Sequence, residues 1–394
     1  MIRKISVSSF KSLADVTVDL GRVNVFVGAN GSGKSNLIEA LGVLGAAAEG
    51  RVNDTNLLAR GVRPGVPDLY KSSFRKTKVR PSIGLEAVSD TASYKVELIN
   101  NPAKRSGSEW LFKSELLMEG EKHVGGRSPA SQDELDPTAG VAATKGSKYV
   151  AARTLLDVLA DYVIYAPTTS TLRGVTMDAQ RREPVGLAGG RLPEAIDELL
   201  RLRESSESIA DACAAALELV DWAHSFGSEE RDAKTPLSPA VEAAASRIVV
   251  FRDRYMAKGR DLLTGYDASE GALYVLLMLV LAVHPAAPRL LAVDNADHAL
   301  NPRLARALFA EMCKWVLGSS EEKQLLLTTH NPLVLDGLPL DHDDVRLFAV
   351  DRTRHGKTVV NRVKVDVEQL QKQGEIWTIS RLWVMGHLGG MPSV

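Results

Sequence analysis

The segment from Gly28 to Ser35 constrains the fold of this chain more than any other. It reads GANGSGKS and satisfies the pattern G-x-x-x-x-G-K-[ST]. An alternating apolar run with Val23, Val25 and Val27 precedes it and predicts a strand, and apolar residues at helical spacing follow it. A strand, a glycine-rich loop and a helix in this order are typical of a phosphate-binding loop (P-loop). We therefore expect a P-loop fold that binds a nucleotide.

Each residue type in the P-loop has a physical role. Backbone N–H groups of the glycine-rich turn face phosphate oxygens, and the helix N-terminus adds a favourable dipole. Lys34 is expected to reach the β- and γ-phosphates, and the Ser35 hydroxyl to bind Mg²⁺. The predicted nucleotide-binding residues of the loop are Gly28, Asn30, Gly31, Ser32, Gly33, Lys34, Ser35 and Asn36.

Three later segments follow in an order that favours the same site. LLAVD is an apolar strand pattern ending in Asp294, a carboxylate suited to Mg²⁺. ASEG opens a predicted helix, and its Ser269 and Gly271 are suited to hold a γ-phosphate presented by a second subunit. LLLTTHNP places His330 after another apolar strand, where it would face the γ-phosphate. A core strand that ends in Asp by chance and a polar loop histidine are the alternative interpretations.

The remaining pattern predicts an α/β fold with a mostly parallel sheet covered on both faces. Three strands precede residue 28, and short strand-like runs from Pro81 to Leu117 predict an antiparallel side sheet. Residues 119–148 read as a mobile loop. The expected division is an ATPase lobe at 1–189, a short insertion of two or three helices at 190–260, and a second ATPase lobe at 261–394.

Composition narrows the class of protein. The 394 residues suffice for two or three domains or one large head, and 45% hydrophobic with 25% charged residues excludes wholesale disorder. The net charge of -1 excludes a globally basic nucleic-acid coat. Cys213 and Cys313 stand alone, so neither a zinc site nor a disulfide is indicated. With no signal-peptide core and no apolar run of bilayer length, we expect a cytoplasmic protein.

Together these motifs resemble the ABC-type ATPase heads of the RecF and SMC class. The opening ISVSSFKSLADVTVDLGRVNVFVGANGSGKSNLIEAL resembles their N-terminal stretch, and DNADHALNP followed by TTHNPLVLD resembles their D-loop and switch region. More narrowly, the chain is similar to stand-alone AAA-type ATPases of bacterial anti-phage modules, Septu-type and retron-associated. This narrower resemblance is carried by VDNADHALNP and the closing EIWTISRLWVMGHLGG. Such ATPases work beside a separately encoded nuclease.

The resemblance implies a homodimer or higher oligomer that closes around ATP and Mg²⁺. The P-loop of one subunit and Ser269 with Gly271 of the other would hold each ATP. The family's positions carry over as Lys34 and Ser35 for phosphates and Mg²⁺, Asp294 for Mg²⁺, Asn301 in the D-loop and His330 for the γ-phosphate. No guanine-reading N-K-x-D string occurs, so ATP is favoured over GTP.

Position 295 departs from the family pattern. Most of these ATPases have Glu directly after the strand's Asp, whereas this chain has Asn295, whose amide can orient a water but cannot accept a proton. We therefore expect slow hydrolysis. Asp297 is either a substitute carboxylate or a capping or surface group. No counterpart of the family's Q-loop glutamine stands before residue 131.

Two basic runs and an aromatic tail remain. The first run contains Lys71, Arg75, Lys76, Lys78 and Arg80, and the second Arg252, Arg254, Lys258 and Arg260. Each suits either a DNA backbone or a solvated, charge-protected surface. The tail contains Ile376, Trp377, Ile379, Leu382, Trp383 and Met385, a stripe that either packs in the core or docks a partner.

Three functions fit this sequence. The first is an ATPase that controls an effector, a nuclease, in anti-phage defence, since the chain shows no nuclease cluster of its own. The second is a RecF-like DNA-repair ATPase. The third is a non-hydrolysing scaffold in which Asn295 leaves ATP bound. None of the three requires a membrane.

Overall fold

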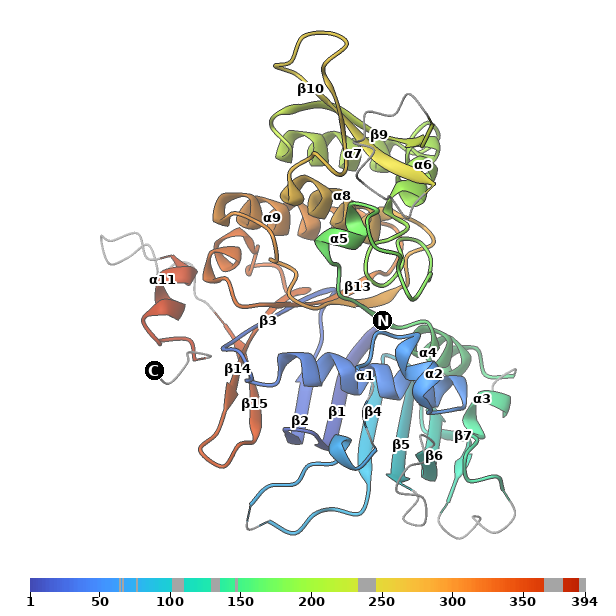
Figure 1. The fold of residues 1–394 in the computed structure, drawn as a ribbon. Coiled ribbons are helices and arrows are strands. Elements are labelled where there is room, and N and C mark those ends of the chain that lie inside the picture. The colour runs from blue at the N-terminus through green and yellow to red at the C-terminus, as the bar shows by residue number, and fades with distance from the viewer. Residues whose placement is uncertain are drawn as a thin grey trace.

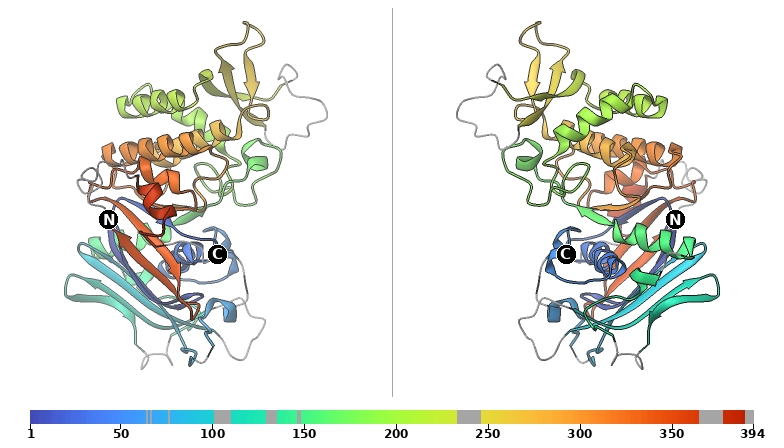
Figure 2. Two further views of the ribbon diagram at one scale, coloured as in Figure 1. Left: turned by 90° about the vertical axis from the view of Figure 1, so that its left-hand side faces the viewer. Right: turned by 90° about the vertical axis from the view of Figure 1, so that its right-hand side faces the viewer.

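The computed structural model describes residues 1–63, 65, 67–75, 77–100, 110–128, 135–145, 148–232, 246–364 and 378–389. Within these residues the chain forms an antiparallel sheet, a mostly parallel sheet and a small third sheet, with layers of helices between them (Figures 1 and 2). The mostly parallel sheet carries the P-loop.

The mostly parallel sheet has the strand order β15-β14-β3-β13-β12-β8. Neighbours from β14 to β8 run parallel, and β15 closes one side antiparallel to β14. Because parallel strands end at one edge, the residues that follow β3, β12 and β13 are brought together there. The strands are β3 (Val23–Val27), β8 (Val163–Tyr165), β12 (Leu290–Val293), β13 (Gln324–Thr329), β14 (Val345–Arg352) and β15 (Thr358–Val363).

Helices cover both faces of this sheet. Alternate side chains such as Val25 and Leu327 pack in one apolar core with helices α8 and α9, whereas Phe26 and Leu326 pack in a second core with α1. This division follows from the period of two along a strand. The prediction of a doubly covered parallel sheet is confirmed. The helices are α1 (Lys34–Glu49), α8 (Glu270–Val283) and α9 (Pro302–Gly318).

Helix α1 lies between the mostly parallel sheet and the antiparallel sheet (Figure 1). Its order is β2-β1-β4-β5-β6-β7, so the predicted side sheet is confirmed and also takes in the first two strands of the chain. The helix α4 (Val150–Ala160) packs beside α1 in the same core. The strands are β1 (Ile2–Phe10), β2 (Leu13–Asp19), β4 (Ile83–Ser89), β5 (Ala92–Asn100), β6 (Trp110–Glu119) and β7 (Lys122–Arg127).

The prediction of a loop throughout 119–148 is wrong where β7 pairs with β6. The sequence of β7, KHVGGR, has no alternating apolar pattern because it is the last strand of the sheet and packs on one side only. Its pairing partner, rather than its own propensity, makes it a strand. Short helical turns lie around this layer: α2 (Asp54–Leu58), the 3-10 turn η1 (Pro67–Tyr70) and α3 (Ala142–Lys145).

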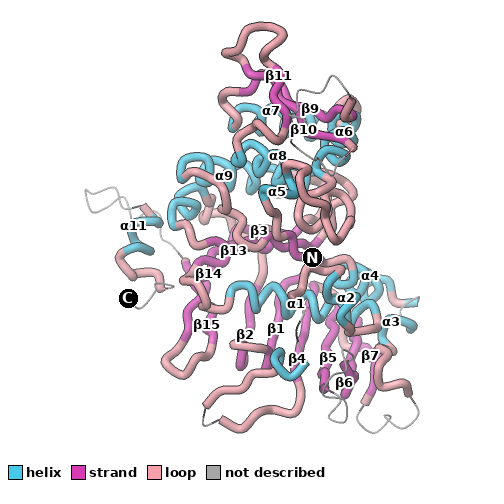
Figure 3. The backbone as a smooth tube through the Cα atoms, in the orientation of Figure 1, coloured by secondary structure: helices cyan, strands magenta, loops and turns pink. Residues whose placement is uncertain are grey.

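The insertion contains strands as well as helices (Figure 3). Helices α6 (Leu192–Leu202) and α7 (Glu207–Leu219) agree with the expectation, but a three-stranded antiparallel sheet of order β11-β10-β9 follows them in the described residues. The prediction of an all-helical insertion is therefore wrong for its second half. The run RIVVF in β10 is β-branched and aromatic, and its buried side favours a strand. These strands are β9 (Ala223–Glu230), β10 (Arg247–Asp253) and β11 (Leu262–Thr264).

The C-terminal tail is anchored on the helical layer. Helix α11 (Ile379–Val384) packs against the 3-10 turn η4 (Pro332–Gly337), and Asp336 of η4 accepts hydrogen bonds from the Ser380 N–H (2.8 Å) and hydroxyl (2.5 Å). Trp383 is buried in the core, whereas Met385 is 51% exposed. Ile376 and Trp377 lie outside the described residues. Among the described helices, none is long and apolar enough to cross a bilayer.

Candidate functional site

The P-loop turns tightly between β3 and α1. Gly31 and Gly33 adopt left-handed backbone conformations, with φ of 78° and 112°. A Cβ at Gly33 would lie 2.1 Å from the Thr358 hydroxyl oxygen, and one at Gly28 would lie 2.3 Å from the Val350 carbonyl oxygen. No real Cβ atom approaches so closely, so both positions require glycine.

Two neighbouring segments hold the back of the loop. The Thr358 hydroxyl oxygen lies 2.7 Å from both the Ser32 carbonyl oxygen and the Ser12 hydroxyl oxygen. Asn36, predicted to bind nucleotide, donates its side-chain amide to the Ser12 hydroxyl at 2.7 Å. The Ser32 hydroxyl is buried and has no hydrogen-bond partner in the described part of the chain. An unsatisfied hydroxyl in this position suits a loop built to bind a polar ligand.

Lys34 lies inside the loop. Its ammonium donates hydrogen bonds to the carbonyl oxygens of Gly28 (2.7 Å) and Ala29 (3.1 Å), and the residue is 7% exposed. Burial lowers the pKa of this ammonium from its ordinary value, although the negative charges of Asp294 and Asp297 act in the opposite direction. A phosphate group would give this partly desolvated charge a stronger acceptor than the two carbonyls. The residues present therefore fit a nucleotide phosphate.

Ser35 and Asp294 meet beside the loop. The Ser35 hydroxyl oxygen lies 3.1 and 3.0 Å from the two carboxylate oxygens of Asp294. The Thr328 hydroxyl donates to Asp294 Oδ1 at 2.6 Å and accepts the Asn295 N–H at 2.8 Å, which fixes the carboxylate at the end of β12. Hydroxyl and carboxylate oxygens are the ligands that Mg²⁺ prefers. These two residues fit a magnesium site.

Asn295 and Asp297, both in the turn after Asp294, lie in different environments. Asn295 is exposed and has a left-handed backbone with φ of 53°. Asp297 is 6% exposed, and its Oδ2 lies 3.8 Å from Nδ1 of His330. The second oxygen of Asp297 is buried and has no hydrogen-bond partner among the described residues. The sequence could not separate a surface Asp297 from a buried one, and the structure shows it buried beside His330.

Ser269 and Asn301 begin two neighbouring helices. The Ser269 hydroxyl accepts the Ala272 N–H at 3.3 Å at the start of α8, and the side-chain Oδ1 of Asn301 accepts the Leu304 N–H at 3.0 Å at the start of α9. A Cβ added at Gly271 would meet the Leu304 side chain at 3.0 Å, so the two helix starts are packed together. Within the described ranges, no hydrogen bond joins Ser269 to the P-loop.

Sequence reasoning missed three hydroxyls that shape the site: Ser12, Thr328 and Thr358. Thr328 lies in LLLTTH, two residues before His330 and near the end of β13, the strand next to β12. The LLLTTH motif could therefore have pointed to it. Ser12 and Thr358 carry no local signal, since their contact joins residues 346 positions apart. The strand β8 was also missed. It ends beside Asp294, whose N–H donates to the Tyr165 carbonyl at 2.9 Å, and APTTS follows it without a glutamine.

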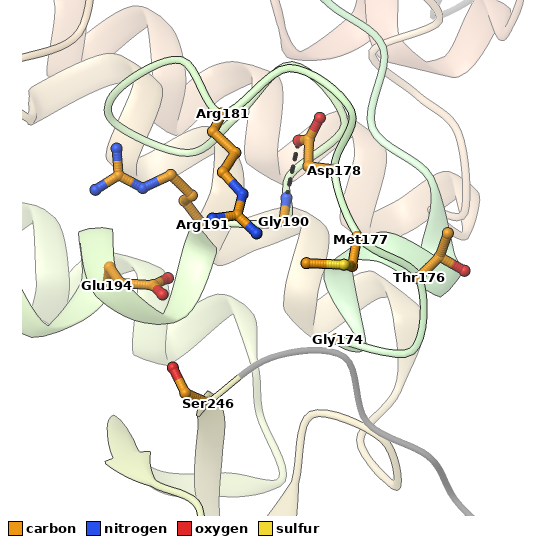
Figure 4. Close-up of a pocket in the computed structure, with 9 residues that line it drawn as sticks. All are labelled: Gly174, Thr176, Met177, Asp178, Arg181, Gly190, Arg191, Glu194 and Ser246. Atoms are coloured by element: carbon orange, nitrogen blue, oxygen red, sulfur yellow. Dashed lines mark hydrogen bonds between the residues drawn. The ribbon is translucent and has the colours of Figure 1, made fainter.

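A separate cavity of about 150 Å³ lies between the 174–191 loop and the insertion (Figure 4). No predicted site residue lines it. Asp178, one of its lining residues, accepts the N–H groups of Gln180 (3.0 Å), Ala188 (2.8 Å) and Gly190 (3.2 Å). The carboxylate therefore braces the loop, and the cavity is not part of the nucleotide site.

Some basic residues of the two runs that suit a DNA backbone have acidic or carbonyl partners within the chain. Arg80 forms an ion pair with Asp15 at 2.7 Å, and Arg252 forms one with Asp261 at 3.3 Å. Arg254 donates to the Ala223 carbonyl at 2.7 Å. Lys76 lies outside the described residues. These contacts favour the interpretation of the two runs as solvated, charge-protected surface. They also reduce the positive charge that remains free to bind a DNA backbone.

Two domain families match the chain. One, described as "AAA ATPase domain", matches residues 1–91, which contain the P-loop. The other, described as "AAA domain, putative AbiEii toxin, Type IV TA system", matches residues 190–336, which contain Asp294 and His330. Both matches are to ATPase domains.

Similar proteins include the DNA replication and repair protein RecF of Renibacterium salmoninarum, which is 43% identical over 61 residues. That match spans 15% of this chain and 15% of the relative's length. An SMC head bound to the C-terminal winged-helix domain of ScpA has 14% identity and a TM-score of 0.56, covering 93% of this chain and 99% of the other. An SMC head from Pyrococcus furiosus bound to the C-terminal domain of ScpA has 13% identity and a TM-score of 0.50, covering 94% and 98%.

The structural likeness establishes the fold, and the two domain matches cover the segments that form the P-loop edge of the sheet. The predicted P-loop ATPase head with mixed sheets and helices is thereby confirmed. Residues 1–91 and 190–336 of the chain therefore match AAA-type ATPase domains, and the chain has an SMC head-like fold.

Proposed function

We propose that this chain binds ATP with Mg²⁺ and hydrolyses it slowly as a dimer. The observation that carries the proposal is the contact between Ser35 and Asp294, at 3.0 Å, directly beside the glycine-dependent P-loop. Phosphate-binding backbone, a lysine and a hydroxyl–carboxylate pair are the parts that a P-loop ATPase requires. The described residues bring all of them to one sheet edge.

The roles of the residues follow from their positions. Lys34 would exchange the carbonyls of Gly28 and Ala29 for the β- and γ-phosphates. Ser35 and Asp294 would hold Mg²⁺, which when bound neutralises charge that builds up on the phosphate oxygens. Asn295 would orient the attacking water through its amide, but it cannot accept a proton, and this supports slow turnover.

The dimer accounts for Ser269, Gly271 and Asn301. Ser269 and Asn301 lie at the N-termini of helices of 14 and 17 residues, where the dipole and free N–H groups favour an anion. Since neither is hydrogen-bonded to its own P-loop in the described ranges, we assign them to the γ-phosphate held by the partner subunit. ATP would then join the two subunits, and hydrolysis would release them.

The further proposal is that this dimer controls a separately encoded effector, a nuclease, in anti-phage defence. Its support is the resemblance of VDNADHALNP and the C-terminal tail to ATPases of such modules. The match to a domain described for a toxin of a toxin–antitoxin system also favours work beside a second protein. Co-purification of the product of the neighbouring gene with the tagged chain tests this role.

A RecF-like role on DNA is the second candidate, favoured by the 43% identity over 61 residues to a RecF protein. It predicts that DNA stimulates ATP hydrolysis and that Lys78→Glu weakens the effect, because Lys78 lines an open cavity near the P-loop. Unchanged turnover with DNA would remove this candidate. A non-hydrolysing scaffold predicts instead that ATP stays bound through purification.

The dimer is tested by mixing two inactive variants. Lys34→Ala disables the P-loop of its own subunit, and Gly271→Asp disables the surface that the subunit offers to its partner. A mixed dimer retains one intact site, so a one-to-one mixture should recover about a quarter of wild-type turnover. No recovery, although both variants fold and exchange subunits, would contradict a site shared between subunits.

A further inference from the structure

The buried carboxylate of Asp297 lies beside the half-exposed imidazole of His330 at the P-loop edge of the sheet. Asp297 lies in the turn after β12, and His330 follows the neighbouring parallel strand β13. The Asn295 and Ala296 N–H groups both donate to Thr328, at 2.8 and 2.9 Å, and fix this turn against β13. The pairing of the two strands therefore determines where Asp297 stands relative to His330.

The surroundings of Asp297 are those of a functional carboxylate rather than a helix cap or surface group. Its side chain is 4% exposed, and Oδ1 has no hydrogen-bond partner in the described part of the chain. Leaving a buried carboxylate oxygen unsatisfied destabilises a fold, so a residue that only shaped the turn would not need this charge. The charge of Asp297 also acts on Lys34, which places it within electrostatic reach of the P-loop.

The orientation of the pair suits one role. Nδ1 of His330 faces Asp297 Oδ2 at 3.8 Å, and the imidazole is 53% exposed, so Nε2 is the nitrogen free to meet a ligand. A carboxylate at Nδ1 keeps the proton on that nitrogen, leaves a lone pair on Nε2 and stabilises the imidazolium when Nε2 gains a proton. Hydrogen bonds of this kind are often long without substrate and shorten when it binds.

We propose that Asp297 is a positioning residue for His330 in ATP hydrolysis and that the pair replaces the proton acceptor that position 295 lacks. The inference rests on the hydrolysis proposed above. The water oxygen bonds to the γ-phosphorus while Nε2 of His330 takes the water proton. The bond between the γ-phosphorus and the β–γ bridging oxygen breaks, and its electron pair leaves with ADP. The imidazolium, held beside the Asp297 carboxylate, then returns its proton to the released phosphate or to solvent.

The first test reads the tautomer and does not depend on turnover. In protein labelled with ¹⁵N-histidine, the His330 signals, assigned by their loss in His330→Gln, should report a proton on Nδ1 in the wild type. Asp297→Asn should shift the population toward the Nε2–H form, and Asp297→Glu should retain the wild-type form. An unchanged tautomer in a folded Asp297→Asn protein would overturn the proposal.

The second test measures kinetics. Asp297→Asn should lower kcat about 10- to 100-fold with KM for ATP nearly unchanged, as expected when the partner of a working histidine is lost. The double variant with His330→Ala should be no slower than His330→Ala alone, because the two residues act as a unit. If the reductions in kcat of the two single variants multiply in the double variant, the two residues act independently, and this would contradict the proposal.

Two controls separate the possible failures. His224→Ala changes an exposed histidine of β9, in the insertion and outside the proposed site, and should leave kcat unchanged. Melting temperatures of all variants separate a folding defect from a kinetic one, and Asp297→Glu serves if Asp297→Asn does not fold. Absence of turnover in the wild type would remove the proposed hydrolysis, whereas the tautomer result would still decide whether Asp297 positions His330.

Discussion

The Ser35 hydroxyl lies 3.0 Å from the Asp294 carboxylate, although 259 positions separate the two residues in the sequence. The contact exists because β3 and β12 flank β13 in one parallel sheet and end at the same edge. It joins the segments covered by the two domain-family matches, 1–91 and 190–336. The candidate site is thus a product of the tertiary fold and not of either segment alone.

This contact predicts how ATP affinity depends on magnesium. Asp294→Asn should abolish most of the gain in ATP affinity that Mg²⁺ gives, because an amide is a weaker ligand than a carboxylate. Affinity in the presence of EDTA should stay within about threefold of wild type, since Lys34 and the P-loop backbone are intact. Fluorescent ATP-analogue titrations with and without Mg²⁺ measure both values. An equal loss in both conditions would show that Asp294 supports the loop and not the metal.

Gly33 is predicted to be far less replaceable than Gly31. Gly33→Ala places a Cβ 2.1 Å from Thr358 at φ of 112°, and it should lower the free energy of unfolding by about 2 kcal/mol or more. Gly31→Ala meets nothing within 4 Å, so only its φ of 78° opposes the change and about 1 kcal/mol should be lost. Urea unfolding of both variants measures the difference. Similar losses would mean that Thr358 does not limit the loop.

Asn295 is predicted to limit turnover. Asn295→Glu supplies a proton acceptor and should raise kcat at least about tenfold, within the range known for general bases. The left-handed backbone at 295 should make the variant less stable by about 1 kcal/mol. Asn295→Gln is the matched control, since it has the same length and the same strain without a base. If Gln accelerates hydrolysis as much as Glu, proton acceptance is not what position 295 lacks.

Glu39 on α1 predicts a pH dependence of stability. Burial opposes the charge of this carboxyl, but Arg63 at 2.5 Å and the Lys11 ammonium outweigh it, so its pKa lies below the ordinary value. A carboxyl with a lowered folded pKa stabilises the fold above its unfolded pKa, and this stabilisation is lost as pH falls through the folded pKa. Glu39→Gln should therefore lower the free energy of unfolding by about 1–3 kcal/mol at pH 7 and by less in acid.

The control for Glu39 is Asp157→Asn. Its ion pair with Arg153 is 51% and 56% exposed on the two side chains, so its loss should change the free energy of unfolding by at most about 0.5 kcal/mol. Urea unfolding at several pH values compares the two variants. A Glu39→Gln loss that does not shrink toward acid pH would contradict the assigned pKa direction.

The sequence predicted the parts of the fold whose signals are local. The P-loop, the strand ending at Val293 and the helix beginning near Pro302 lie where their patterns place them. The β9–β10 pair was missed because AHSFGSEE has little strand propensity, and its pairing with Ile248 to Phe251 is what makes it a strand.

The candidate site also contains some residues that local sequence patterns predict and others that only the folded structure reveals. Lys34 and Asp294 could be found from motif order, whereas the role proposed for Asp297 depends on burial and on a neighbour from another strand. Likewise, the hydroxyls that hold the P-loop come from β15 and the β1–β2 turn, far away in the sequence. Spacing along the chain carries no information on such contacts.

Phosphate release from Mg²⁺-ATP, measured for the purified wild type beside Lys34→Ala, tests the central claim most directly. The Lys34 ammonium donates a hydrogen bond at 2.7 Å to the Gly28 carbonyl oxygen, and it would exchange this acceptor for a phosphate when ATP binds. Removing the ammonium should weaken ATP binding about 10- to 100-fold. The account predicts slow but measurable turnover by the wild type that Lys34→Ala abolishes. Wild-type release no faster than that of Lys34→Ala would contradict the claim that this chain hydrolyses ATP.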